Sequence, residues 1–153
     1  MSAQLKEVPQ LRPMRSADLD AVMRIEGEIY SHPWTRGNFQ DSLNAGYSCW
    51  IYELAGHLIG YAVMMVAAEE AHLLNLSVTA GWQGQGWGKK FLKHLVGVAR
   101  RYHAKVLLLE ARPSNAAGLK LYRGYGFRQI ALRRGYYPAS NGREDAVLLE
   151  LKL

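Results

Sequence analysis

A glycine-spaced loop between an apolar segment and an amphipathic segment is the clearest candidate for chemistry in this sequence. Residues 74–78 (LNLSV) read as the end of a strand, residues 83–89 (QGQGWGK) as the loop, and the residues that follow as a helix. Glycines let the backbone adopt positive φ and approach a ligand closely, so several N–H groups can point at one anion. The positive end of the helix dipole lies behind them. The loop is therefore predicted to hold the pyrophosphate of a nucleotide-like cofactor.

The spacing within the loop separates the cofactor classes that use such a structure. A Walker loop needs Gly-Lys followed by Ser or Thr, but here Lys90 follows Gly88 and Lys89. A dinucleotide loop needs G-x-G-x-x-G and an acidic residue about 20 positions later. Gly84 and Gly86 are present, the third glycine is missing, and a later glutamate could supply the acidic group. The dinucleotide loop therefore stays open as an alternative, as does a glycine-rich turn that binds nothing.

A third pattern, Gln/Arg-x-x-Gly-x-Gly/Ala, is filled completely by Gln83, Gly86 and Gly88. This pattern resembles the acetyl-CoA loop of the GNAT acetyltransferases. Leu121-Tyr122 followed by Gly126-Phe127 matches the L-Y-x-x-x-G-F signature of the same family. The resemblance covers nearly the whole chain and implies acetyl-CoA as cosubstrate, with no metal. It implies that the cofactor is bound by Leu76, Ser77, Val78, Gln83, Gly84, Gln85, Gly86, Trp87, Gly88, Lys89 and Asn115. Gly84 replaces a basic residue that is usual in the family, which is expected to weaken cofactor affinity.

The elements that must position these residues alternate in a definite order, β-α-α-β-β-β-α-β-α-β-β. The strands are expected at residues 11–14, 47–53, 58–66, 72–78, 106–110, 128–134 and 145–153. Four helices are expected. The first ends near residue 30, and the others span residues 35–46, 88–102 and 115–125. The long helix is expected to bury Phe91, Leu92, Leu95, Val96, Ala99 and Tyr102. Residues 106–109 are apolar throughout, which predicts a strand buried on both faces and paired in parallel with residues 72–78.

This order predicts an α+β (mixed α/β) GNAT fold. Its central mixed sheet is mostly antiparallel, with one parallel βαβ crossover, and is flanked by helices. The 153 residues are expected to form a single domain, residues 1–153. Apolar content of 49% and charged content of 21% fit a globular protein, and the net charge of +6 fits a polyanionic cofactor without requiring nucleic acid. The single cysteine, Cys49, favours the reducing cytoplasm and is expected to be inert inside a strand.

The resemblance implies that Glu110 accepts a proton and that Tyr122 donates one. Acetyl transfer needs a neutral amine, and an α-amine has a pKa of ~8 against ~10.4 for lysine. A carboxylate can take its proton directly or through one water. The departing thiolate, of pKa ~8.5, can be protonated by a tyrosine of pKa ~10. Backbone N–H groups near residues 76–78 could stabilise the oxyanion if a bulge leaves them unpaired. Glu110 could instead pair with Arg112 or cap a helix, and Tyr122 could be a core aromatic.

Residues 109–115, 133–138 and 142–146 resemble the branch of the family that acetylates the N-terminal alanine of a small-subunit ribosomal protein. Gly135 departs from that pattern, where a polar residue is commoner. The resemblance suggests that Tyr136, Tyr137 and Pro138 line a peptide cleft. Glu26 lies on the apolar face of the first helix and is favoured to reach solvent at its edge, with a site-lining position as the alternative. The acidic residues expected to offset a basic peptide are Glu26, Glu69, Glu144 and Asp145.

The sequence thus predicts direct acetyl transfer to a ribosomal N-terminus in a ternary complex, by a monomer that needs neither nucleic acid nor a membrane. Acetylation of lysine or of a small amine is the nearest alternative. A silent ribosomal RNA-binding module and an oxidoreductase using the dinucleotide loop remain further alternatives.

Overall fold

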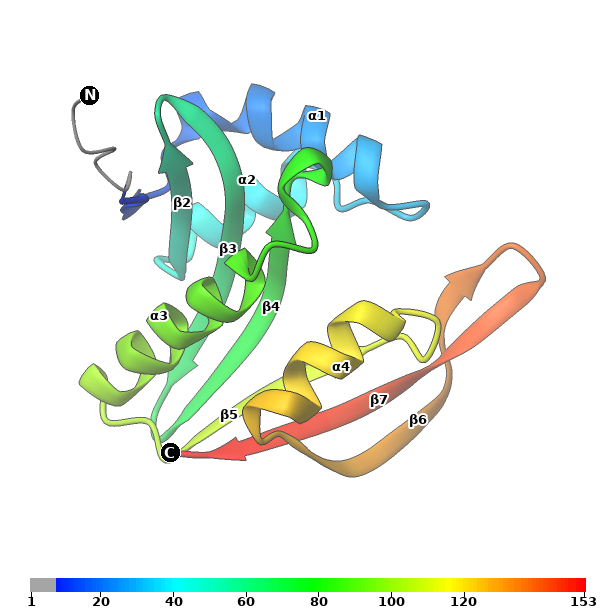
Figure 1. Ribbon diagram of the computed structural model, residues 1–153. Helices are drawn as coiled ribbons and strands as arrows, with labels where there is room; N and C mark the ends of the chain where they lie inside the picture. Colours follow the sequence, from blue (N-terminus) through cyan, green and yellow to red (C-terminus); the bar gives the residue numbers. More distant parts are fainter. Residues whose placement is uncertain (1–7) are drawn as a thin grey trace.

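The computed structural model describes residues 8–153 and contains one seven-stranded sheet with helices on both faces (Figure 1). The strands are β1 (Gln10–Pro13), β2 (Ser48–Leu54), β3 (His57–Ala67), β4 (Glu70–Val78), β5 (Val106–Ala111), β6 (Arg128–Ala139) and β7 (Gly142–Lys152). The helices are α1 (Leu19–Ile29), α2 (Arg36–Asn44), α3 (Trp87–Arg101) and α4 (Ala116–Tyr125), with short 3-10 turns η1 (Ser16–Asp18) and η2 (Ala80–Trp82). The predicted order of elements and the fold class are confirmed.

The strands lie in the order β1-β2-β3-β4-β5-β7-β6, and β4 with β5 is the parallel pair of this sheet. Their pairing runs from Glu70 opposite Val106 to Leu73 opposite Leu109 and then stops, although β4 continues to Val78. Beyond Leu73 the two strands diverge, as Figure 1 shows. The diverging part of β4 therefore has a backbone edge without a strand partner on the β5 side.

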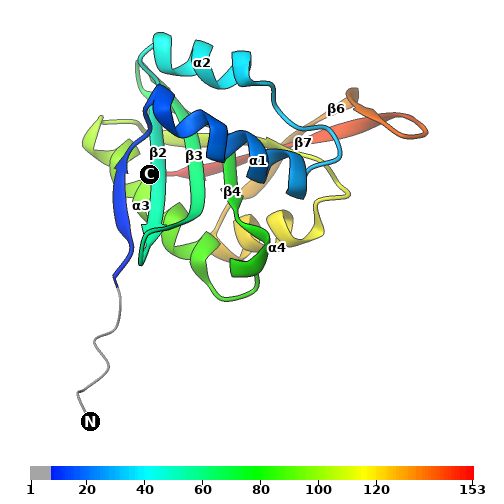
Figure 2. The same ribbon diagram turned by 90° about the horizontal axis from the view of Figure 1, so that it is seen from above.

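Two apolar clusters hold the helices to the sheet, one on each face. On one face α3 and α4 cover a core that includes Phe91, Leu95 and Leu107. On the other face α1 and α2 contribute Leu19 and Phe39 to a smaller cluster. Figure 2 shows α1 and α2 on the side of the sheet opposite α3 and α4. The sheet is thus the middle of three layers, and the gap between β4 and β5 lies between the two helix layers.

A β-bulge in β4 changes which face the following residues occupy. Val63 of β3 pairs with Asn75 and Met64 pairs with Leu73, so Leu74 is an extra residue in β4. Before the bulge Leu73 packs in the α3 core, whereas after it Leu76 packs there and Asn75 is turned to the opposite face. A bulge reverses the alternation of inward and outward side chains. Polar side chains consequently enter the layer beneath α1.

Three predicted details are wrong. The last strands were expected to end at residue 134 and begin at 145, but β6 reaches Ala139 and β7 begins at Gly142. The segment between the two expected strands is therefore mostly hairpin, with Gly135 at φ +60° beside an irregularity in the pairing. Tyr102 is 60% exposed because α3 ends one residue before it. Strand β5 is fully buried on only one face, since its residues alternate between buried and half-buried.

Among residues 8–153, no helix has both the length and the apolar character required to cross a lipid bilayer. Cys49 is buried, and burial raises the pKa of its thiol to about 11, which agrees with the expectation of an inert residue.

Candidate active site

A cavity of about 810 Å³ lies where β4 and β5 diverge. Its walls come from β4, β5, the segment between α1 and α2, the start of α4 and the tip of β6. Segments that are far apart in sequence therefore meet at this one opening. Ligands of sheets with parallel strands bind at the carboxyl ends of those strands, where this cavity lies.

Glu110 and Tyr122 line the same cavity, from β5 and α4 respectively. The Glu110 side chain is 26% exposed, and its Oε1 lies 3.6 Å from Nη2 of Arg133. The ion-pair partner is thus Arg133, and the alternative of a pair with Arg112 is wrong. Tyr122 is 8% exposed and packs edge-to-face on Phe127, and burial raises the pKa of its phenol above the ordinary value.

The loop before α3 has the backbone conformation that its glycines predict. Gly84 and Gly86 have φ of +73° and +86°, in the left-handed region that other residues adopt at a cost. Gly86 is the N-cap of α3, so the first amides of that helix have no acceptors within the helix. The Gln83 side chain donates a hydrogen bond to the Val78 carbonyl at 2.9 Å, and Gln85 donates one to Gly81 at 3.2 Å. Both glutamines therefore tie the loop to itself rather than extending from it.

The β4 residues predicted to contact the cofactor differ in whether they face the cavity or are buried in the protein. Leu76 lines the cavity, while Ser77 is 1% exposed and hydrogen-bonded within the protein. The bulge lies at Leu74, two residues before the segment where it was expected, and Leu74 itself also lines the cavity. Asn115 is the N-cap of α4 and accepts a hydrogen bond from the Gly118 amide at 3.1 Å, so its carbonyl oxygen has a structural partner.

The sequence matches the Acetyltransferase (GNAT) family over residues 19–127, which is well over half of the chain. The chain belongs to the GNAT acetyltransferase family. This GNAT acetyltransferase is 34% identical over 140 residues to the [Ribosomal protein bS18]-alanine N-acetyltransferase of Escherichia coli K12, covering 92% of this chain and 95% of that protein. Membership of this transferase family excludes the oxidoreductase alternative.

Solved structures share the arrangement of the elements. The crystal structure of the ribosomal-protein-S18-alanine N-acetyltransferase from Escherichia coli superposes with a TM-score of 0.88 at 32% identity, covering 95% of this chain and 94% of that one. An acetyltransferase from Salmonella typhimurium, solved with its cofactor acetyl-CoA, has the same fold at a TM-score of 0.78 and 21% identity, covering 95% and 94%. In the described part of the GNAT chain, residues 8–153, no group of three or more His, Cys, Asp or Glu side chains is placed to hold a metal ion.

The expectation that Glu26 reaches solvent at the edge of α1 is wrong. Glu26 lines the cavity but is only 1% exposed, and its carboxylate accepts hydrogen bonds from other elements. The helical spacing placed Glu26 correctly on the inward face of α1, but it could not reveal the hydrogen-bond donors that surround the carboxylate, because they come from other elements.

The β6–β7 hairpin forms another wall of the cavity. Tyr137 and Pro138 line the cavity, whereas the 44% exposed Tyr136 is not part of its lining. The Arg112 guanidinium lies 4.5 Å from the centre of the Tyr137 ring and donates a hydrogen bond to the Pro138 carbonyl at 2.7 Å. Burial, with a smaller contribution from the Glu110 charge, raises the pKa of Tyr137 to about 12.

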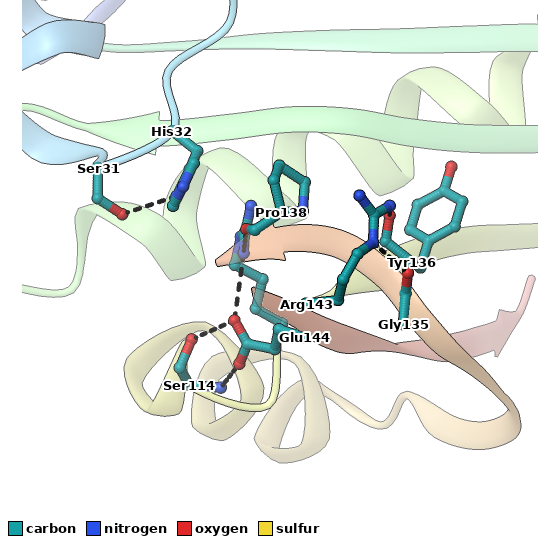
Figure 3. Close-up of polar contacts among 9 residues, drawn as sticks. Ser31, His32, Ser114, Gly135, Tyr136, Pro138, Arg143 and Glu144 are labelled. Carbon is teal, nitrogen blue, oxygen red and sulfur yellow. Dashed lines mark hydrogen bonds and ion pairs between the residues drawn. The ribbon is translucent and has the colours of Figure 1, made fainter. Parts of the chain in front are cut away.

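Glu144 holds this hairpin to the segment before α4, and the sequence did not predict this role. It accepts hydrogen bonds from the hydroxyl and the amide of Ser114 at 2.9 and 2.8 Å (Figure 3). It also accepts one from Arg112 at 3.2 Å. The Ser114 hydroxyl is the largest cause that lowers the pKa of Glu144. Glu69 pairs instead with Lys105, away from the cavity lining, and Asp145 accepts from the Gly135 amide. Neither Glu69 nor Asp145 lines the cavity.

Proposed function

We propose that this GNAT acetyltransferase transfers acetyl from acetyl-CoA to the N-terminal alanine of a small-subunit ribosomal protein. The observation that carries the proposal is the joint position of Glu110 and Tyr122 on one cavity where β4 and β5 diverge. Sequence identity of 34% to the Escherichia coli bS18-alanine enzyme supports the choice of acceptor.

The cofactor half of the proposed site combines the glycine loop with the open edge of β4. The positive φ of Gly84 and Gly86 suits a loop whose amides, with those at the start of α3, converge on a pyrophosphate. The edge of β4 beyond Leu73 offers backbone groups to the amide-containing arm of coenzyme A. Of the remaining residues in this half, Leu76 supplies cavity wall, and the Nδ2 of Asn115 is available to a ligand.

The proposed chemistry is a direct transfer in a ternary complex. The amine nitrogen attacks the thioester carbonyl, the new C–N bond forms, and the C–S bond breaks. Glu110 accepts the proton that leaves the amine, and Tyr122 donates a proton to the departing thiolate. Burial raises the pKa of the Tyr122 phenol, so the phenol is protonated in the neutral range, and the same shift makes it a weaker acid toward the thiolate. No nucleophile from the protein is needed.

The acceptor peptide is proposed to lie between the α1–α2 segment and the β6–β7 hairpin. Tyr137 provides one wall, Tyr136 extends it toward the surface, and Glu26 lies beneath the opposite wall. The α-amine is the better acceptor because its pKa of ~8 leaves far more of it neutral than lysine's ~10.4 does.

A thiol-release assay with acetyl-CoA tests the proposal. One peptide starts with the N-terminal residues of the ribosomal protein, and a control peptide has a blocked N-terminus and an internal lysine. Release with the first peptide alone is the expected result. Thiol release with the lysine peptide alone would instead support acetylation of lysine side chains. If the protein does not bind acetyl-CoA, the alternative that remains is a ribosomal RNA-binding module without catalytic activity.

A further inference from the structure

A continuous chain of hydrogen bonds joins both ends of the segment between α1 and α2 to strand β4. At one end, the Tyr30 hydroxyl lies 2.7 Å from the hydroxyl of Ser77, which donates to Oδ1 of Asn75 at 2.7 Å. Asn75 Nδ2 then donates to Oε1 of Glu26 at 3.3 Å. At the other end, the Trp34 amide donates to Oε2 of Glu26 at 2.8 Å. We call this path Tyr30–Ser77–Asn75–Glu26–Trp34 the acceptor tether.

The acceptor tether exists because of the bulge at Leu74. Without the extra residue, Asn75 and Ser77 would continue the alternation of Leu73 and face the α3 core. With it, both side chains are buried beneath α1, where they meet Glu26. The strand proposed to hold the cofactor is thereby connected through side chains to the segment proposed to hold the peptide.

The carboxyl group at the centre of the tether is buried among neutral partners. Glu26 is 1% exposed, and no lysine, arginine or histidine within residues 8–153 forms an ion pair with it. Its three donors are neutral, the third being the Tyr61 hydroxyl at 2.7 Å. Burying a polar group costs stability unless it is hydrogen-bonded, and a fully hydrogen-bonded buried network holds its members in one arrangement.

We propose that Glu26 is a positioning residue that sets the conformation of the acceptor wall at residues 30–34. It acts through Trp34 and Asn75 and does not itself accept the substrate proton. The inference rests on the proposed function, since it assigns the walled space to the peptide. The segment lines the cavity from Tyr30 to Trp34, so a shift of its backbone alters the peptide site directly.

Glu26→Gln cuts the tether whichever way the new amide turns. If its oxygen faces Tyr61 and Asn75, its NH₂ group opposes the Trp34 amide. If the amide turns round, its NH₂ group opposes Asn75, whose own amide is fixed by the hydroxyl of Ser77. In both orientations two donors face each other, so the path from Trp34 through residue 26 to β4 is broken, while the Tyr30 hydroxyl keeps its contact with Ser77.

Tyr61→Phe is the matched control, because it removes a donor from the same buried carboxylate and leaves the tether whole. Peptide KM, acetyl-CoA Kd and hydrogen exchange of residues 30–35 are measured for both variants at a temperature where each is folded. We expect Glu26→Gln to raise peptide KM about tenfold and to speed exchange of that segment, with acetyl-CoA Kd unchanged. Tyr61→Phe is expected to lower the unfolding temperature while keeping wild-type peptide KM.

Tyr30→Phe cuts the tether at its exposed end and keeps the test available if Glu26→Gln does not fold. It is expected to raise peptide KM in the same direction. A wild-type peptide KM in both cut variants, or an equal rise in Tyr61→Phe, would overturn the positioning role. If the wild type releases no thiol with the peptide, the proposed function fails, and hydrogen exchange of residues 30–35 still reports whether Glu26 holds the segment.

Discussion

Nη2 of Arg133 lies 3.6 Å from Oε1 of Glu110, so the proposed proton acceptor has a cation beside it before a substrate arrives. Arg133 comes from β6, and its guanidinium also lies 5.4 Å from the centre of the Tyr136 ring. The Arg133 side chain is 55% exposed, and ion pairs that open to solvent are weak. The ammonium group of an incoming peptide can therefore take the place of the arginine at little cost.

Glu110→Gln is expected to lower kcat at neutral pH by about 10²-fold or more, because the amide cannot accept the amine proton. Acetyl-CoA Kd, measured by calorimetry, is expected to stay at the wild-type value. The loss of rate is expected to shrink at higher pH, where more of the amine is already neutral. Wild-type turnover at neutral pH would remove Glu110 from the mechanism.

Tyr122→Phe removes only the phenolic oxygen and keeps the ring against Phe127, 5.7 Å between centroids. We expect kcat to fall by about 10²-fold with little change in peptide KM, because the departing thiolate loses its proton donor. The unfolding temperature serves as the control and is expected to change little. A wild-type kcat would instead make Tyr122 a core aromatic.

Gly86→Ala tests the loop by conformation alone, because an added Cβ at Gly86 meets no atom within 4 Å. An alanine at φ +86° is strained by about 1–2 kcal/mol, so we expect acetyl-CoA affinity to fall about tenfold as the loop changes shape. Gly97→Ala is the matched control, since Gly97 lies within α3, has equal space and lacks positive φ. Equal acetyl-CoA affinity in the two variants would argue against the loop as a pyrophosphate site.

Tyr137→Ala is expected to raise peptide KM about tenfold, since it removes an aromatic wall of the cavity. Tyr136→Ala removes the neighbouring ring, which lies outside the cavity lining, and is expected to have a much smaller effect. Steady-state kinetics at saturating acetyl-CoA measure both. A peptide KM unchanged by Tyr137→Ala would exclude this wall from peptide binding.

Glu144→Gln is expected to loosen the β6–β7 hairpin in a pH-dependent manner. The folded-state pKa of Glu144 is lowered below its ordinary value of 4.5, so its contribution is present above that value. The contribution is lost as the pH falls through the lowered pKa, because the protonated group no longer holds Ser114 and Arg112 as strongly. The wild type should unfold at a higher temperature than the variant at neutral pH, and this difference should vanish in strong acid. A difference that is the same at both pH values would contradict the role of this carboxylate.

The sequence by itself determined the family, the order of the elements and the backbone conformation of the glycine loop. These features are local: Gln83, Gly86 and Gly88 lie within one loop, and the amphipathic pattern of α3 lies within one helix. Glycine spacing and hydrophobic periodicity report backbone conformation directly, without reference to distant segments. The same local evidence placed Glu110 at the end of a strand and Tyr122 on a helix.

Only the tertiary structure decided how the acceptor half is built. The bulge at Leu74 depends on how β4 pairs with β3, and that register turns Asn75 toward Glu26. The Arg133 partner of Glu110 likewise comes from a different strand. Pairing between strands is set by packing across the whole sheet, and a slip of one residue reverses every side chain that follows. The pattern within a single strand cannot reveal that slip, so the burial of Glu26 appears only once the sheet is assembled.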